Sequence, residues 1–345
     1  MSEAHGINHF KNETILIAPL DWGLGHATRC LELVHRLIPH NTVILGITPT
    51  TEPILSAAFP HLRRVKLPSL SFYISARSVF WKSAIRQLFK ICITRFREKQ
   101  WLHTFIKSEP ALSVVISDNR YGMYHPVLKT VLLTHQLNMQ IPAILFLAKW
   151  LHKFWSNRFQ YLWVPDYADS QKALGGALSH APAFHPKMCF VGPLSQLKAR
   201  GLSKTILWDV AVLLSGPEPK RSDWALSLIQ GLTTERILHT VLLSPTQLPV
   251  PTRNVPSNIQ ILVLPDSKLI AECLSQSKLI IARSGYSTLM DLDRLNKPTC
   301  LLVPTPGQWE QEYLASYWAK RGWAKTTTEK NWQKNAGKIL KEFGF

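Results

Sequence analysis

A histidine and an aspartate that could share a proton each follow an apolar run typical of a β-strand. His26 stands in the segment DWGLGHATR, directly after the run TILIA, and Asp118 stands in the segment SDNRYG at the end of a later run. Because the carboxyl ends of parallel strands meet at one edge of a sheet, Asp118 could orient His26 and stabilise its imidazolium. That is the arrangement of a general base with its carboxylate partner. The commoner alternative is that His26 caps a helix, and that Asp118 caps a turn and pairs with Arg120.

The turn that contains His26 is also suited to holding a ligand. Gly23 and Gly25 allow the backbone to turn tightly and to approach a ligand closely. The helix expected after them begins with unpaired N–H groups, which suit an anion or a sugar oxygen. The third glycine of a dinucleotide-binding fingerprint is missing, and so is the acidic residue after the second strand. An NAD site is therefore disfavoured.

Two turns in the second half of the chain could hold a phosphate group. The segment SGPEP, which contains Ser215 and Gly216, follows one apolar run, and the segment RSGYSTLMD follows another. The second segment leads into a predicted helix, so its N–H groups and hydroxyls predict a diphosphate cradle. Asp291 lies one turn further, where its carboxylate could accept hydrogen bonds from two ribose hydroxyls. The cradle residues are Ser284, Gly285, Ser287 and Thr288.

The elements that must position these residues follow a regular alternation. Short β-branched runs alternate with helix-compatible segments, which is typical of βαβ units and parallel sheets. We expect strands at 14–18, 42–47, 64–67, 112–117, 130–134, 161–164, 206–214, 237–243, 259–264, 278–282 and 299–303. So many strands in one sheet would be unusual, so two doubly wound α/β domains fit the pattern better. The segment VGPL predicts the boundary, with domains at 1–195 and 196–325 and a closing helix at 326–345 that could pack back on the first domain.

The composition of the 345 residues excludes several classes of protein. Hydrophobic residues make up 46% and charged residues 18%, which excludes a disordered chain. Five cysteines without a C-x-x-C pair argue against a disulfide framework and a structural zinc site. The net charge of +18 favours an anionic partner, and its spread over both halves argues against a detachable nucleic-acid-binding arm. No secretory signal and no run of about 20 apolar residues is visible, so we expect a cytoplasmic protein.

Two aromatic and basic segments have more than one interpretation. Ala76–Lys107 contains eight basic residues and one acidic residue among its aromatics, which is a signature of a helix at an anionic membrane surface. The alternative is core aromatics with Lys and Arg side chains extended to solvent, and both interpretations stay open. For Pro142–Trp163, whose aromatics also alternate with basic residues, packing in the core or in a domain cleft is favoured.

Six motifs taken together are similar to those of a known enzyme class. DWGLGHATR, SDNRYG, THQLN, SGPEP, RSGYSTLMDL and PTPGQWEQEY, in this order, resemble the two-domain nucleotide-sugar glycosyltransferases of the GT-B fold. Within that class the chain resembles a bacterial subfamily of the MurG-like enzymes of glycosyltransferase family 28. The resemblance covers nearly the whole chain. It implies two Rossmann-like domains whose parallel sheets face each other across a cleft, the first binding the acceptor and the second binding the nucleotide sugar.

The resemblance also assigns roles to individual residues. Acceptor-side residues would be Gly23, Gly25, Asn119, Arg120, His135, Gln136 and Asn138. Donor-side residues would be Ser215, Gly216, Arg283, Ser284, Gly285, Ser287, Thr288, Asp291, Gln308 and Gln311. The chain departs from the family pattern in three places: THQLN lacks a glutamate, SGPEP replaces a G-G-S-x-G loop, and Asp291 replaces a glutamate. The pair of His26 and Asp118 also resembles the catalytic dyad of plant family 1 transferases.

Together these resemblances imply an inverting transfer of a sugar, N-acetylglucosamine or a similar hexose, from a UDP-sugar to an acceptor hydroxyl. The acceptor would be a lipid-linked or cell-envelope glycan, and the enzyme would work at the inner face of a cytoplasmic membrane. No metal or other cofactor is expected, because no D-x-D motif stands at a strand end and the helix after Arg283 could stabilise the leaving diphosphate.

Two alternative functions fit the sequence less well. A hydrolysing UDP-sugar 2-epimerase of the same fold would need a cluster of acidic residues, and no matching cluster is visible. A non-enzymatic basic protein that binds RNA or a membrane would explain the charge but not the predicted phosphate cradle. Nucleic acid is therefore not an expected partner.

Overall fold

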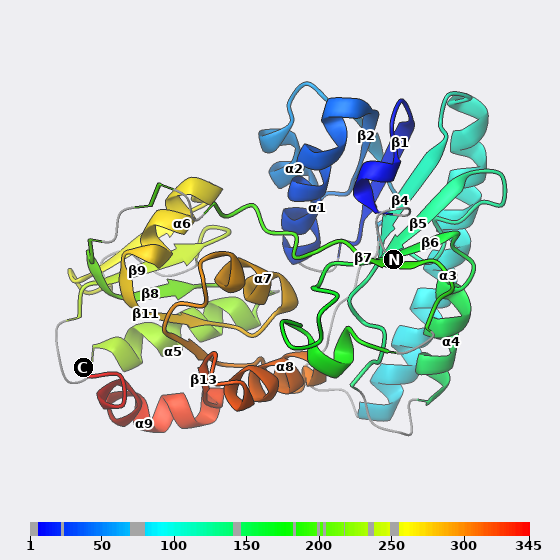
Figure 1. Cartoon of the computed structure of the whole chain (residues 1–345). Coiled ribbons are helices and arrows are strands. Elements are labelled where there is room, and N and C mark those ends of the chain that lie inside the picture. The colour runs from blue at the N-terminus through cyan, green and yellow to red at the C-terminus, as the bar shows by residue number, and fades with distance from the viewer. Residues whose placement is uncertain are drawn as a thin grey trace. The chain divides into compact units, whose positions relative to one another are not determined.

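The computed structural model describes residues 6–21, 24–69, 80–140, 146–181, 184–198, 201–202, 205–216, 218–233, 238–248 and 255–345, with the side chains of 24 and 80–89 excepted. The chain divides into two units, Met1–Leu194 and Ser195–Phe345, and the boundary expected from the sequence falls at this division. Each unit contains one parallel β-sheet with helices between its strands (Figure 1). The predicted fold class, two doubly wound α/β domains, is confirmed.

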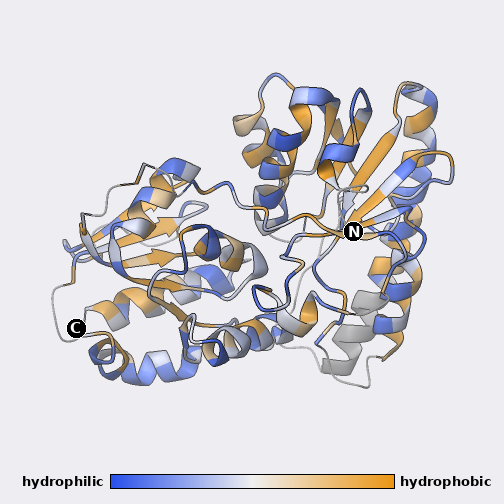
Figure 2. Cartoon of the chain, in the orientation of Figure 1, coloured by the Kyte–Doolittle hydropathy of each residue, from blue (hydrophilic) through white to orange (hydrophobic). Residues whose placement is uncertain are grey.

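The first unit is built on a seven-stranded sheet with the strand order β3-β2-β1-β4-β5-β6-β7. Its strands are β1 (Thr14–Pro19), β2 (Thr42–Ile47), β3 (Arg63–Lys66), β4 (Val114–Asp118), β5 (Lys129–Leu133), β6 (Tyr161–Val164) and β7 (Met188–Phe190). Its helices are α1 (Leu24–Leu37), α2 (Glu52–Ala58), α3 (Phe80–Ser108) and α4 (Phe146–Ser156), with short 3₁₀ turns at Ile7–His9, Ile38–His40 and Gly176–Leu178. The central strands are apolar and buried, because α1 and α2 lie on one face of the sheet and α3 and α4 lie on the other (Figures 1 and 2).

The chain order of the first sheet reverses at its centre. β1 pairs with β2 on one side and with β4 on the other, and Pro19 lies opposite Asp118 in parallel register. The connection that leaves β1 leads to α1, whereas β4 continues through a loop to β5. In open α/β sheets, ligands bind at such a switch point, beyond the carboxyl ends of the strands.

The second unit repeats this plan with six strands in the order β10-β9-β8-β11-β12-β13. Its strands are β8 (Trp208–Leu213), β9 (Thr240–Ser244), β10 (Ile259–Val263), β11 (Ser277–Ala282), β12 (Cys300–Leu302) and β13 (Lys325–Thr326). Its helices are α5 (Lys220–Leu232), α6 (Ser267–Ser275), α7 (Tyr286–Arg294), α8 (Trp309–Lys320) and α9 (Glu329–Lys341). The edge strands β7 and β13 are absent from the sequence prediction, because three and two residues carry too little periodicity to be recognised.

The closing helix α9 packs on α5 within the second unit. Trp332 is fully buried between them, with its ring 6.2 Å from that of Trp224 and its Nε1 donating to the Ser227 carbonyl oxygen at 3.2 Å. Gly231 allows this approach, because a Cβ at this position would lie 2.8 Å from Nε1 of Trp332. The buried face of α9 thus lies within its own unit, and a packing of this helix on the first domain stays a prediction.

Helix α4 exposes aromatic side chains for which packing in the core or in a domain cleft is predicted. Trp155 is buried as expected, but Phe146, Trp150 and Phe154 are 71%, 58% and 40% exposed. These three residues recur every four positions and therefore share one face of the helix, whereas Trp155 lies on the other. Core packing is therefore wrong for these three side chains, which form the outer face of α4, and packing in a domain cleft stays a prediction. Residues 142–145 of the segment Pro142–Trp163 lie outside the described residues.

The other aromatic and basic segment, Ala76–Lys107, coincides largely with α3. Its residues 76–79 and the side chains of 80–89 lie outside the described part of the chain. Further along, Phe96 is exposed, whereas Leu102 is buried against the first sheet. The described part thus combines an exposed face with a packed one, and its contact with a membrane stays a prediction.

A buried arginine fixes the loop that follows β4. Arg120 donates from Nε to the Pro19 carbonyl oxygen at 2.7 Å, and from Nη1 to the Pro68 carbonyl oxygen and to Oε1 of Glu98, both at 2.9 Å. The other carboxylate oxygen of Glu98, on α3, accepts from the Gly122 amide at 3.0 Å. Arg120 and Glu98 are both almost fully buried, so this pair ties β1, α3 and the loop after β4 together without access to solvent.

We expect Arg120→Met to lower the free energy of unfolding by about 3–5 kcal/mol, because it leaves the buried carboxylate of Glu98 without its cation. Adding Glu98→Gln should restore part of the loss, since the amide no longer carries a charge. Urea denaturation measures both changes. The exposed pair of Arg63 and Glu109 offers the matched control, and Arg63→Met should cost less than about 1 kcal/mol. A double variant no more stable than Arg120→Met would contradict this account.

Candidate functional site

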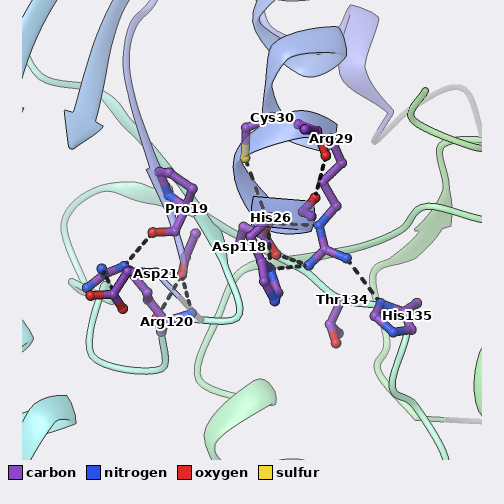
Figure 3. Close-up of polar contacts among 12 residues, drawn as sticks. Pro19, Asp21, His26, Arg29, Cys30, Asp118, Arg120, Thr134 and His135 are labelled. Atoms are coloured by element: carbon purple, nitrogen blue, oxygen red, sulfur yellow. Dashed lines mark hydrogen bonds and ion pairs between the residues drawn. The ribbon is translucent and has the colours of Figure 1, made fainter. Parts of the chain in front are cut away.

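Two strand ends of the first unit bring a histidine and a carboxylate together. β4 ends at Asp118, and α1 carries His26 in its first turn, soon after the end of β1. Nδ1 of His26 lies 3.0 Å from Oδ2 of Asp118 (Figure 3). The side chain of Asp118 is 1% exposed and that of His26 is 17% exposed. Solvent therefore reaches the imidazole but not the carboxylate that holds it.

Arg29, one helical turn after His26, is the main partner of Asp118. Its Nε donates to Oδ2 of Asp118 at 2.8 Å, and its Nη2 donates to Oδ1. Its Nη1 lies 3.2 Å from Nδ1 of His135, in the loop after β5 (Figure 3). The sequence analysis assigns no role to Arg29. The signal that points to it is its spacing in HATR, because residues i and i+3 share a face of a helix.

The charges of this cluster determine the protonation of its members. Burial by itself raises the pKa of Asp118, but the Arg29 guanidinium and His26 outweigh this effect and hold the pKa well below its usual range. Burial lowers the pKa of His26, and Arg29 lowers it further against the opposite effect of Asp118. Burial raises the pKa of the Cys30 thiol, whose Sγ lies 3.7 Å from Asp118. Near neutral pH the cluster is therefore a carboxylate, a guanidinium, a thiol and a neutral imidazole.

A buried tyrosine and a buried histidine join the neighbouring loops. The Tyr121 hydroxyl, in the loop after β4, donates to Nδ1 of His152 at 2.7 Å, and Nε2 of His152 donates to the Gln136 carbonyl oxygen at 2.6 Å. Burial lowers the pKa of His152 to about 4, so this ring stays neutral. Through His152, α4 connects the loop that follows Asp118 with the loop that contains His135.

The remaining acceptor-side residues differ in what they can offer to a ligand. Gly25 lies in the first turn of α1, and Gly23 lies outside the described residues. Asn119 follows the catalytic candidate Asp118 with a φ of 56°, a left-handed conformation that asparagine tolerates. Asn138 is exposed. Arg120 has a structural role in place of the predicted contact with an acceptor, because its guanidinium is buried and bound within the first unit.

In the second unit, the predicted cradle forms the start of α7. The helix begins at Tyr286 after Gly285, and no side chain caps its first turn. A Cβ added at Gly285 would come no closer to other residues than 3.9 Å, from Oγ1 of Thr288. The hydroxyl of Ser284 donates to the Gln311 carbonyl oxygen at 2.7 Å and so holds this turn beside α8. Gly285, the residue before this turn, has no side chain to cap the helix and leaves space there, as an anion site requires.

Arg283, predicted to contact the donor, is buried and structural. Its Nη1 donates to the carbonyl oxygens of Val303 and Pro304 at 3.1 and 3.2 Å, and its Nη2 donates to Glu329 at 2.9 Å. The guanidinium also lies 4.4 Å from the ring centre of Trp224. Arg283 thus positions the loop after β12 and the start of α9 next to the cradle.

Two further loops of the second unit are ordered by their own side chains. Oε1 of Gln311 accepts from the Thr305 amide at 2.8 Å, and its Nε2 donates to Oε1 of Gln308 at 2.6 Å. Gly216, which follows Ser215, has a φ of 101°, and its carbonyl oxygen accepts from Arg221 at 3.2 Å. These predicted donor residues therefore shape the loops at the carboxyl ends of β8 and β12.

Asp291, one turn into α7, is a carboxylate in an unfavourable place for a charge. Its Oδ1 accepts from the Ser195 hydroxyl at 2.5 Å. Burial raises the pKa of Asp291 to about 7, against the smaller opposite effect of Ser195. The folded chain therefore favours the protonated form of this side chain below about pH 7.

A metal centre would need several ligand side chains close together. In the part of the chain that the structure describes, no three His, Cys, Asp or Glu side chains are grouped in this way.

Comparison with known proteins identifies the fold. No protein-family model and no curated protein sequence matches the chain. Among solved structures, it is similar to the calicheamicin glycosyltransferase CalG4, at a TM-score of 0.67 and 14% identity over 96% of this chain and 90% of that one. MurG of Acinetobacter baumannii has a TM-score of 0.58 at 13% identity, over 96% of this chain and 90% of its own. UGT89C1 of Arabidopsis thaliana, complexed with UDP-L-rhamnose, has a TM-score of 0.61 at 13% identity, over 97% and 92%. The chain has the GT-B fold that the sequence resemblance implied.

We expect Asp291→Asn to stabilise the protein by about 1–3 kcal/mol at pH 8.5, because the amide removes the cost of burying a charge and can still accept from Ser195. The gain should shrink as the pH falls through 7, where the native carboxyl takes up a proton that the unfolded chain does not yet bind. Thermal melting across pH 5–8.5 measures this dependence. Asp209→Asn is the control of opposite sign, because Lys278 lowers the pKa of Asp209 after its burial cost is overcome. A constant difference between wild type and Asp291→Asn at every pH would speak against the raised pKa.

Proposed function

We propose that this chain transfers a sugar from a nucleoside diphosphate sugar to an acceptor hydroxyl, with inversion at the anomeric carbon. The observation that carries the proposal is the 3.0 Å contact between His26 and Asp118 at the switch point of the first sheet, in a chain with the GT-B fold. Solved neighbours with this fold are glycosyltransferases, which supports the same class of reaction here.

His26 would act as the general base. With its Nδ1–H directed to Oδ2 of Asp118, the ring keeps a lone pair on Nε2 that can take the proton of an acceptor hydroxyl. Asp118 holds the tautomer and stabilises the imidazolium that forms. Because the pKa of His26 is lowered, the ring is in its basic form near neutral pH.

The donor would bind to the second unit. The first-turn N–H groups of α7 and the hydroxyls of Ser287 and Thr288 suit a diphosphate, and Asp291 suits the ribose hydroxyls. The plant neighbour that was solved with UDP-L-rhamnose supports a UDP-sugar as the donor class. We expect no metal ion to be needed, because the helix terminus can stabilise the leaving diphosphate. The sugar would be N-acetylglucosamine or a similar hexose, and the acceptor a lipid-linked or cell-envelope glycan.

The outer face of α4 is suited to an anionic membrane surface, at which the enzyme would work from the cytoplasmic side. The rings of Trp150 and Phe154 stack at 5.3 Å, and the Arg158 guanidinium lies 4.8 Å from the centre of the Phe154 ring. Lys153 is exposed beside them. Aromatic rings with interspersed cations bind the headgroup region of anionic bilayers. Among the described residues no helix has the length and apolar run of a membrane span.

Replacing His26 and Asp291 should separate turnover from donor binding. We expect His26→Ala to lower kcat by about 10²–10⁴-fold with unchanged UDP affinity, and Asp291→Ala to weaken UDP binding by about 1–3 kcal/mol. Turnover assays with a panel of UDP-sugars and calorimetry with UDP measure the two effects. His35→Ala is the matched control, because His35 is an exposed histidine on the same helix.

The products of the same assay, together with binding measurements, distinguish the proposed function from its two alternatives. A glycosylated acceptor with free UDP supports the proposal. Free UDP with a free epimerised sugar would instead identify a hydrolysing epimerase, and salt-sensitive RNA binding without UDP binding would identify a nucleic-acid-binding protein. Wild-type kcat in a folded His26→Ala protein would refute the role of His26.

Flotation with liposomes tests the membrane proposal. We expect the protein to float with anionic vesicles at low salt and to be released at high salt, because each cation near the surface contributes about 1 kcal/mol. The double variant Trp150→Ser and Phe154→Ser should lose most of this binding. Val127→Ser and Leu264→Ser, which remove exposed apolar side chains elsewhere, should not. Equal binding to neutral vesicles, or an unaffected double variant, would rule out α4 as an anionic-membrane surface.

A further inference from the structure

We infer that Arg29 is a positioning residue. Its guanidinium binds Asp118 and balances part of the negative charge of that carboxylate, and this helps to keep His26 in its basic form. This inference rests on the proposed role of His26 as a base. The arrangement differs from a pair of histidine and aspartate alone, in which the full charge of the carboxylate stabilises the protonated imidazole.

Arg29 binds the carboxylate of Asp118 through more contacts than His26 does. The guanidinium is almost fully buried and uses its side-on fork, Nε and Nη2, for the two oxygens of Asp118. Such bidentate pairs are the strongest form of a charge-assisted hydrogen bond. His26 shares only Oδ2, at 3.0 Å, with Nε of Arg29 at 2.8 Å from the same oxygen. Arg29 therefore balances part of the negative charge with which Asp118 stabilises an imidazolium.

Asp118 favours the tautomer of His26 that carries its proton on Nδ1. A lone pair on Nδ1 would face the ionised Oδ2 of Asp118 and be repelled by it, so we expect the proton on Nδ1 and the lone pair on Nε2. Nη2 of Arg29 lies 2.8 Å from the same Nδ1. A second proton would place an imidazolium directly against a guanidinium, and this repulsion opposes protonation of the ring.

The titratable groups that face the ring come from three elements. Asp118 comes from β4, Arg29 and Cys30 from α1, and His135 from the loop after β5. The Cys30 thiol stays protonated, because burial raises its pKa. Nδ1 of His135 lies 3.2 Å from Nη1 of Arg29. Arg29 is thus the cation of this group, and it acts against the stronger effect of Asp118 on the ring.

Titration of His26 by NMR, through its imidazole ¹⁵N and ¹³C resonances, tests the inference without an activity assay. Wild-type His26 should carry its proton on Nδ1 and titrate below the ordinary histidine value. In Arg29→Gln, whose Asp118 is uncompensated, His26 should titrate about 1–3 pH units higher. Arg29→Lys keeps the positive charge, so His26 should titrate near its wild-type value in this variant. Its kcat should fall, because lysine cannot contact both oxygens of Asp118 as the guanidinium does. Arg36→Gln, a half-buried arginine of the same helix that pairs with Glu32, should behave as wild type.

The outcomes separate this inference from the proposed function. The acidic limb of the kcat profile should move to higher pH together with the titration of His26 in Arg29→Gln. Unchanged titration in that variant, or a wild-type His26 that titrates at or above the ordinary value, would overturn the role of Arg29; the wild-type measurement decides even where Arg29→Gln does not fold. A wild-type protein that shows the expected titration but transfers no sugar would refute the proposed function alone.

Discussion

A buried carboxylate has to be compensated, and at the centre of the first unit this requirement determines the arrangement of the sheet edge. Asp118 ends a strand that is buried along its whole length, so water cannot solvate it. Its compensation comes from Arg29, which fixes the rotation of α1 about its axis and with it the direction of His26. The same guanidinium reaches His135 and thereby holds the loop after β5. One charge thus orients a helix and a loop that lie about a hundred residues apart in the sequence.

The second unit uses a buried cation in a comparable way. Arg283 ends β11 inside the protein and satisfies its donors with carbonyl oxygens of the loop after β12 and with Glu329 at the start of α9. The start of α7 lies directly after it, so this turn cannot shift without breaking the ion pair of Arg283 and Glu329. In both units, a buried ion pair fixes the end of a strand, and the residues suited to a ligand follow in the chain directly beside it.

The sequence predicts the fold well because its signal is local. Apolar runs such as TILIA and KLIIA, separated by helical segments, predict parallel strands buried on both faces, and strand-end convergence brings His26 and Asp118 together. What it cannot predict is whether a polar residue of a motif faces a ligand or the interior. Arg120 and Arg283 stand in ligand-like motifs, yet Glu98 and Glu329, distant in the sequence, bind them inside the protein. The aromatics of α4 occur on both helix faces, so periodicity alone does not show which of them are covered.

Pairs of buried opposite charges also constrain how such a chain can change over evolutionary time. Loss of Glu98 leaves Asp21 as the anion beside the buried guanidinium of Arg120, and loss of Arg120 leaves the carboxylate of Glu98 without its cation, so either substitution is costly by itself. We therefore expect Arg120 and Glu98 to be replaced together, or one after the other through a neutral intermediate such as glutamine at position 98. Arg120, in the SDNRYG motif, is therefore expected to change only together with Glu98, which lies in a helix outside the motif.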